Sequence, residues 1–196
     1  FVLAVNGGCG DYQSSVLSFD SDGDIDWSLD ASLGDGQTKA CGVSGEGIVL
    51  LFLDQTVWVD RLVFIDGTGN VRTGPEVDLD TDVRVRTMIV DGDRILLGGY
   101  SNNSPWTGCL DRSGALIWQR TLEDFSGSVS DMAVSPDGSL TLCGFMSESD
   151  GLPLAGLCRL DADGNVEWSR RFGGGEYQYF ESVSILDDGG IILAGT

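Results

Sequence analysis

The sequence predicts an all-β protein, because two short patterns alternate along it and each is typical of a β-hairpin. The clearest copy of the first pattern is residues 160–168, which read LDADGNVEW. An apolar residue and an Asp precede a tight turn containing Gly, and the strand that follows ends on Trp. The pattern recurs at residues 19–27, 65–73 and 110–118, with Thr73 in place of the Trp in one copy.

The second pattern is a strand, a turn with Gly, and a continuous apolar strand. Its four copies are residues 41–51, 88–98, 133–143 and 184–194, and they align without a gap. Glycine supplies the positive φ that hairpin turns require. The 29 glycines of the chain fit a fold with many such turns.

The two hairpins together repeat every 45–50 residues, measured between Asp20, Asp66, Asp111 and Asp161. A period of this length that holds four strands is typical of the blades of a β-propeller. The apolar runs do not alternate with polar residues, which fits strands covered on both faces by neighbouring blades. The predicted fold is therefore a β-propeller of four-stranded antiparallel blades, with about four repeats.

The order of the hairpins predicts where each blade begins. If the strands of a blade are named A to D from the axis outward, the chain reads B-C-D, three full blades, and a final A-B. As one domain of residues 1–196, the repeats lie near 1–36, 37–83, 84–128 and 129–178, with a partial repeat at 179–196. The terminal strands allow a four-blade ring closed by the last A strand, part of a longer propeller, or completion by another subunit.

Residues 160–168 and 186–195 resemble the repeats of bacterial and archaeal secreted propellers, whose blades read Asp-x-x-Gly-x-x-x-Trp and then Asp-Gly-Gly. More distantly, they are similar to the repeats of pyrroloquinoline-quinone enzymes and of a related outer-membrane assembly propeller. The resemblance implies a propeller in an extracellular or cell-surface protein. The quinone enzymes would also imply a calcium site and a vicinal disulfide, but the sequence has no adjacent cysteines and too few repeats.

The charge balance argues against several partners. The chain has 31 acidic and 11 basic residues, a net charge of −20, and Lys39 as its one lysine. Phosphate backbones and anionic membrane surfaces would repel it, so we expect no nucleic-acid partner. No run of about 18 apolar residues is present, so we expect no membrane insertion through a helix.

The five cysteines form no Cys-x-x-Cys pair, and the chain has no histidine, which argues against a zinc site. Cys143 and Cys158 lie on the two sides of a predicted hairpin. They either face each other or are free thiols buried in the core, and we favour free thiols for most of the five cysteines.

An acidic turn is the one candidate metal site. Asp20, Asp22, Asp24 and Asp26 alternate around Gly23, and carboxylates in this arrangement could converge on calcium, the only cofactor the sequence suggests. The full EF-hand spacing is absent. The competing and favoured interpretation is a turn in which the first Asp bonds to the backbone and Gly takes the left-handed conformation.

The start of each A strand should line the propeller channel. By alignment these positions include Lys39, Arg86, Asp131 and Glu181, which could bind a small polar ligand or pair with one another. Trp27, Trp118 and Trp168 recur at one repeat position, so we expect them to pack between blades or cover their outer edge.

No catalytic pattern accompanies these features. A Ser/His/Asp triad needs a histidine, and no Gly-x-Ser-x-Gly motif occurs. The sequence therefore predicts a non-enzymatic extracellular structural or interaction module that binds protein, including itself through edge strands. The alternative is a sugar- or calcium-binding propeller domain of a secreted protein or enzyme.

Overall fold

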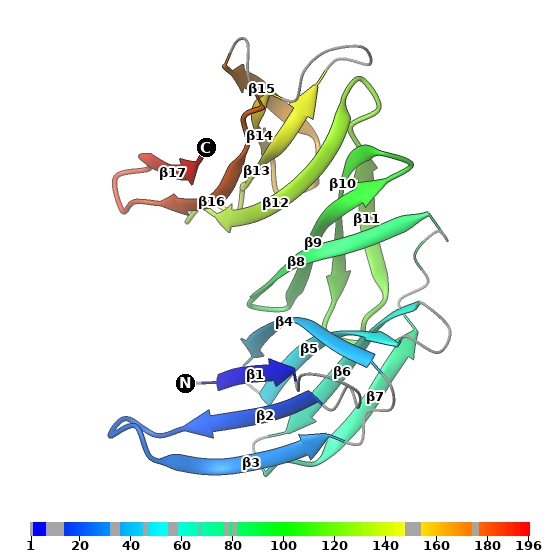
Figure 1. The fold of residues 1–196 in the computed structure, drawn as a ribbon, viewed down its shortest axis with the longest axis vertical. Coiled ribbons are helices and arrows are strands. Elements are labelled where there is room, and N and C mark those ends of the chain that lie inside the picture. Colours follow the sequence, from blue (N-terminus) through cyan, green and yellow to red (C-terminus); the bar gives the residue numbers. More distant parts are fainter. Residues whose placement is uncertain are drawn as a thin grey trace. The chain divides into compact units, whose positions relative to one another are not determined.

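The computed structural model describes residues 2–6, 14–31, 36–44, 47–54, 59–66, 68–76, 79, 82–147, 154–173 and 177–196. These residues form β-strands joined by turns and short connections (Figure 1). They contain no helix that could cross a membrane. The chain divides into two compact units, the first comprising Phe1–Asp78 and Arg112–Ala115 and the second Leu79–Asp111 and Leu116–Thr196.

The first unit contains two antiparallel sheets. One has the order β1-β2-β3, with strands Val2–Asn6, Ser14–Phe19 and Ile25–Ala31. The other has the order β4-β5-β6-β7, with strands Gly36–Ser44, Gly47–Asp54, Val59–Asp66 and Val71–Glu76. Each strand pairs with the next one along the chain, as in a meander.

The second unit contains three such sheets. Strands β8 to β11 are Val83–Asp91, Arg94–Ser101, Ser104–Asp111 and Leu116–Thr121. Strands β12 to β15 are Ser126–Val134, Leu140–Ser147, Ala155–Leu160 and Val166–Phe172. A two-stranded sheet of β16 and β17, Phe180–Ile185 and Ile191–Gly195, follows. The three four-stranded antiparallel meanders confirm the predicted blade architecture, with a three-stranded sheet before them and a two-stranded sheet after them.

The recurring tryptophans pack against the sheet that follows their own. Trp27 lies against a cluster that includes Leu50 and Val63 of the β4–β7 sheet. Trp118 packs against the cluster that contains Leu140 and Leu160 of the β12–β15 sheet. Trp168 in turn packs on a cluster formed with β16 and β17. The prediction that these side chains lie between blades is confirmed, and the burial of large aromatic surface there joins neighbouring sheets.

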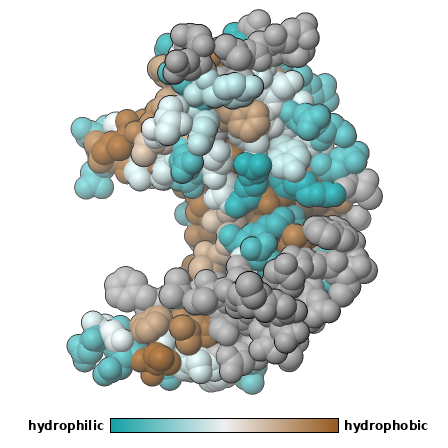
Figure 2. Space-filling model, viewed as in Figure 1, coloured by the Kyte–Doolittle hydropathy of each residue, from teal (hydrophilic) through white to brown (hydrophobic). Residues whose placement is uncertain are grey.

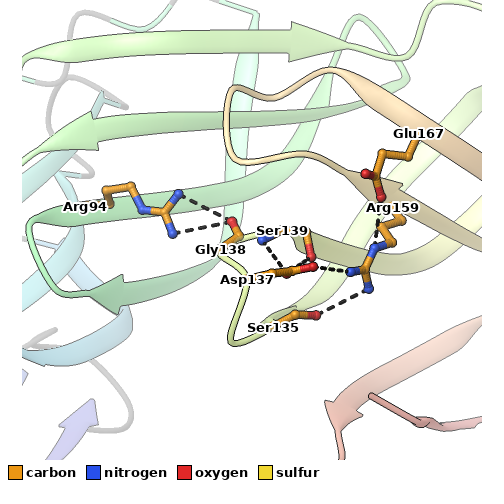
Figure 3. A network of polar contacts seen from close by, with 7 residues as sticks. All are labelled: Arg94, Ser135, Asp137, Gly138, Ser139, Arg159 and Glu167. Carbon is orange, nitrogen blue, oxygen red and sulfur yellow. Dashed lines mark hydrogen bonds and ion pairs between the residues drawn. The ribbon is translucent and has the colours of Figure 1, made fainter. Parts of the chain in front are cut away.

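An arginine network adds polar contacts around the turn between β12 and β13 (Figure 3). Arg159 donates to Glu167 Oε2 at 2.9 Å and to Asp137 Oδ2 at 3.0 Å, which ties that turn to the β14–β15 hairpin. From the preceding sheet, Arg94 donates to the Gly138 carbonyl oxygen at 3.4 and 3.5 Å. The same turn therefore has polar contacts within its own sheet and with its neighbour.

Aspartates organise the turns of the outer hairpins. The Oδ1 atoms of Asp20, Asp66 and Asp161 each accept hydrogen bonds from the backbone amides two and four residues later. Glycine follows three residues after each of these aspartates, with φ between 80° and 88°. Only glycine adopts this conformation without a steric penalty, and the Asp supplies the acceptor that closes the turn.

These turns should make the protein sensitive to acid. Hydrogen bonds from Thr68 and Asn70 hold the pKa of Asp66 well below its ordinary value, and those from Asn165 similarly lower the pKa of Asp161. An aspartate with a lowered folded-state pKa stabilises the fold above its unfolded pKa of about 3.9 and loses that contribution as the pH falls. The double variant Asp66→Asn/Asp161→Asn should therefore have a lower melting temperature at pH 7 but a smaller further decrease between pH 5 and pH 2.

The control for this measurement is Asp163→Asn, which removes a carboxylate from one of the same turns. The Asp163 side chain accepts no hydrogen bond from the described residues. Its variant should keep the acid sensitivity of the original protein. An equal loss of acid sensitivity in the control and the double variant would contradict the assignment.

The cysteines have separate surroundings. Register pairs Cys143 with Leu157 and Cys158 with Leu142, so the two cysteines face opposite sides of the sheet and do not meet. Cys109, Cys143 and Cys158 are buried free thiols, and burial raises the pKa of Cys143 and Cys158 to about 12. Cys9 lies outside the described residues.

Candidate ligand cavity

The first strands of their sheets, which are the predicted A strands β4, β8, β12 and β16, each carry a β-bulge. The pairing of strands A and B skips Lys39 in β4, Arg86 in β8, Ser130 in β12 and Glu181 in β16. A bulge inserts one unpaired residue, bends the strand and changes the direction of its side chain. The repeated bulge is therefore a position at which polar side chains are freed from the sheet.

Asp131 does not occupy this position, so the gap-free alignment is wrong by one residue there. The β4–β5 and β8–β9 turns have two residues, because Ser44 pairs with Gly47 and Asp91 with Arg94. At the β12–β13 turn, the Ser135 amide donates to the Ser139 carbonyl oxygen, which leaves three residues in the turn. The longer turn shifts strand β12 by one residue, and Ser130 takes the bulge.

Lys39 is engaged within the first unit. Its Nζ lies 2.7 Å from Asp60 Oδ1 on β6, and the two side chains are 19% and 7% exposed. This partly buried ion pair satisfies the charge at the β4 bulge. The structure thus places Lys39 in a different environment from the bulge residues of the second unit.

The second unit has a cavity at its bulges, with a volume of about 640 Å³. It is lined by one bulge residue from each of three successive sheets and by three aromatic side chains: Arg86, Ser130, Phe145, Tyr177, Tyr179 and Glu181. Phe145 belongs to β13, and both tyrosines belong to the connection that leads into β16. A cavity of this size, with aromatic walls and a few polar groups, is typical of ligand sites.

The two charged residues of the cavity have no ionic partner among the described residues. The guanidinium carbon of Arg86 lies 5.5 Å from the centroid of the Tyr100 ring, so an aromatic face supports the cation. Glu181 is exposed. Because the chain carries far more acidic than basic residues, an arginine without a carboxylate partner in a cavity is a distinctive feature.

Asp131 supports this cavity from the side. Its Oδ2 accepts hydrogen bonds from the Ser182 hydroxyl at 2.9 Å and from the Val183 amide at 3.0 Å. Both donors belong to β16, the strand that carries Glu181. Asp131 therefore holds β16 against β12 and fixes the distance between two walls of the cavity.

Asp131→Ala should destabilise the protein by about 1.5–3 kcal/mol, because the Val183 amide loses a hydrogen bond to a charged acceptor. Hydrogen exchange should accelerate at Val183 more than at amides of β13. Chemical denaturation and exchange mass spectrometry would measure both effects. Asp163→Ala is the control, and an equal effect of the two substitutions would contradict the role of Asp131.

The acidic turn does not gather its carboxylates. Asp20 uses its Oδ1 for the backbone amides of Asp22 and Asp24, at 2.9 and 3.0 Å. Across the residues with described positions, no group of three or more His, Cys, Asp or Glu side chains is placed to hold a metal ion. Calcium binding by Asp20, Asp22, Asp24 and Asp26 stays a prediction.

Ser130 and all three aromatic residues of the cavity are absent from the residues that the sequence predicts for the channel. A signal for Ser130 was present, since Pro-Asp-Gly at residues 136–138 favours a longer turn than the Gly-Asp of residues 92–93. No repeat pattern identified Tyr177 and Tyr179, because they lie in a connection between blades.

Comparison with known proteins shows the fold. No family model matches the chain, and no curated protein sequence matches it. Among solved structures, the Dos1 propeller aligns with a TM-score of 0.58 and 12% identity, over 90% of this chain and 48% of that one. A eukaryotic initiation factor aligns with a TM-score of 0.53 and 14% identity, over 91% of this chain and 44% of the other.

A third structure, YCF48 bound to a D1 peptide, aligns with a TM-score of 0.42 and 12% identity, over 93% of this chain and 71% of that one. The chain spans about half the length of the first two structures. At these identities the similarity concerns architecture. Together with the repeated meanders, the similarity to the Dos1 propeller shows that this chain has the fold of a β-propeller.

Proposed function

We propose that this protein is a non-enzymatic interaction module that binds its partner in the cavity of the second unit. One observation carries the proposal: Arg86 and Glu181 line the same cavity, and neither has an ionic partner among the described residues. Charged groups that are not used within a protein are available for a ligand. The surrounding Phe145, Tyr177 and Tyr179 supply apolar contact area.

The residue types support binding. Tyrosine and arginine are enriched among the residues that dominate interface energies, because each combines a large contact area with directional hydrogen bonds. Tyr177 is 72% exposed and Tyr179 37% exposed, so a ligand would cover surface that now faces solvent. Substituting such exposed side chains should leave the fold intact.

A location outside the cell is part of the proposal. The resemblance of residues 160–168 to secreted repeats supports it, as does the acidic composition. Proteinase treatment of intact cells of the source organism would test it. Degradation of the protein without lysis is expected, whereas full protection until lysis would contradict this location.

Ligand-observed NMR with a mixed library of amino acids, small peptides, sugars and aromatic acids would test the binding site. We expect some compounds to bind. The substitution Tyr177→Ala should lower their affinity at least about fivefold, as for a residue that contributes about 1 kcal/mol to binding. The control is Ile117→Ala, which removes an exposed apolar side chain of β11. Binding that is equal in both variants, or no binding at all, would contradict the proposal.

A second candidate function is self-association through β17, and the exposure of its apolar residues favours it. Ile192 is 53% exposed, whereas the residues at the same repeat position, Val49, Leu96 and Thr141, are at most 2% exposed. Figure 2 shows apolar side chains gathered over the β16–β17 hairpin. In the β8–β11 sheet, Leu96 belongs to the same buried cluster as Leu140 and Leu142 of the next sheet.

A second copy of this chain offers blades of the same kind, and we propose it as the occupant of the β17 face. Light scattering of the purified protein should show a dimer or larger species, and Ile192→Asp should give a monomer. A monomeric original protein, or an Ile192→Asp variant that still associates, would contradict self-association.

A further inference from the structure

We infer that the cavity recognises a short zwitterionic peptide, with a carboxylate bound at Arg86 and a cationic group bound at Glu181. This inference rests on the proposed function and specifies the ligand of the same site. Its basis is the order of the bulge residues, a cation on β8, a hydroxyl on β12 and an anion on β16. Because the three sheets follow one another, the opposite charges stand on opposite sides of Ser130.

Arg86 is the residue that would bind the carboxylate of the ligand. The guanidinium carbon of Arg86 lies 5.5 Å from the centroid of the Tyr100 ring, and no described carboxylate pairs with its N–H groups. A guanidinium edge matches a carboxylate through two parallel hydrogen bonds. The aromatic face also holds the side chain in one orientation, which lowers the entropy lost when a ligand binds.

Glu181 is the residue that would bind the cationic group of the ligand. The carboxylate lies on the bulge of β16, whose backbone Asp131 fixes through Ser182 and Val183. No described residue supplies a cation for it. An ammonium or guanidinium group of the ligand would provide this counter-charge through charge-assisted hydrogen bonds.

The middle of the cavity favours a peptide over a sugar. Ser130 is half-buried, and its hydroxyl can both donate to and accept from a peptide group. The rings of Phe145 and Tyr179 supply apolar walls for a ligand side chain. A neutral sugar would leave Arg86 and Glu181 without counter-charges, and so would not use the two most specific groups of the site.

The net charge of the chain, −20, further limits which ligands the cavity can bind. A purely anionic ligand would be repelled by the net negative charge of the protein, and a purely cationic ligand would be repelled by Arg86 inside the cavity. A ligand that carries both charges avoids both penalties. The shared chemistry, one carboxylate and one cation around an apolar body, can come from the termini of a free oligopeptide or from the side chains of a protein segment.

The test is calorimetric titration with the tripeptide alanyl-tyrosyl-alanine in four forms: free, acetylated, amidated, and blocked at both ends. Amidation removes the carboxylate and should weaken binding about tenfold or more, as for lost hydrogen bonds to a charged group. Acetylation removes the ammonium group and should have a similar effect. A blocked peptide with aspartate and arginine side chains flanking tyrosine represents the protein segment, and the tighter of the two ligands identifies the source.

Variants then assign each end. In Arg86→Gln, amidation should no longer weaken binding, while acetylation still should. In Glu181→Gln the pattern should be reversed. Arg170→Gln is the matched control. Arg170 is also exposed, and its guanidinium carbon lies 5.9 Å from the centroid of the Trp168 ring, but Arg170 does not line the cavity.

Three results would overturn the inference: no binding of any peptide at millimolar concentration, equal binding of the four forms, or variants that leave the charge dependence unchanged. Each of these results is compatible with binding of library compounds that Tyr177→Ala weakens. In that case the cavity would remain the binding site, and only the ligand class would be wrong.

Discussion

Trp106→Ala should reduce the free energy of unfolding by about 3–5 kcal/mol, the usual cost of removing a large aromatic side chain from a core. Trp106 is 2% exposed and is the largest fully buried side chain among the described residues. Its ring packs over Gly108 so closely that a Cβ there would lie 2.8 Å from it. Its Nε1 donates to Gln119 Oε1 at 3.3 Å, so the substitution also removes a hydrogen bond from a half-buried amide.

Urea denaturation followed by circular dichroism would measure this loss. Ile117→Ala on the adjacent strand β11 is the control, because Ile117 is 57% exposed and should cost less than about 1 kcal/mol. A Trp106→Ala protein as stable as the Ile117→Ala protein would contradict the packing of the β8–β11 sheet.

Gly164→Ala should cost more stability than Gly23→Ala, although both glycines occupy the same turn position. Their φ values are 80° and 88°, so each alanine introduces a strain of about 1–2 kcal/mol. The difference lies in their neighbours. A Cβ at Gly164 would lie 2.7 Å from the ring of Trp118, whereas a Cβ at Gly23 would meet nothing within 4 Å.

Overpacking against the partly buried Trp118 ring adds about 1–3 kcal/mol, and this is the expected difference between the two variants. In a Trp118→Ala background the extra cost at Gly164 should disappear, because the double-mutant cycle removes the clash. Equal costs of Gly164→Ala and Gly23→Ala in the original protein would contradict the packing of Trp118 against the next sheet.

The blades could be predicted from the sequence because their physical causes are local and repeated. Asp20, Asp66 and Asp161 each precede a Gly that takes the left-handed conformation, and this chemistry identifies the turns without knowledge of the rest of the fold. The tryptophans could be placed between blades because their period matches that of the sheets.

The cavity could be predicted only in part. The sequence points to Arg86 and Glu181, but to Asp131 in place of Ser130, because one additional turn residue shifts the register of β12. The β16–β17 turn has the same additional residue, so there the gap-free alignment gives Ser182 in place of Glu181. Register depends on hydrogen bonds across the turn, and a gap-free alignment does not contain that information. Tyr177 and Tyr179 could not be found, because connections between blades have no period.

The sequence also could not predict which charged residues form ion pairs. Lys39 and Asp60 are 21 residues apart and form an ion pair in the first unit. Arg86 has the same repeat position as Lys39, but no described carboxylate pairs with it. Whether a cation is neutralised or available depends on contacts between strands, which only the folded chain determines.

Fluorine NMR of protein labelled with 3-fluorotyrosine tests the central claim most directly, since the chain has only four tyrosines. Phenylalanine substitutions would assign the signals of Tyr100, Tyr177 and Tyr179. On titration with compounds that bind the protein, the signals of Tyr177 and Tyr179 should move together and saturate at the same concentration. Binding that leaves both signals unchanged would contradict the assignment of this cavity as the site of interaction.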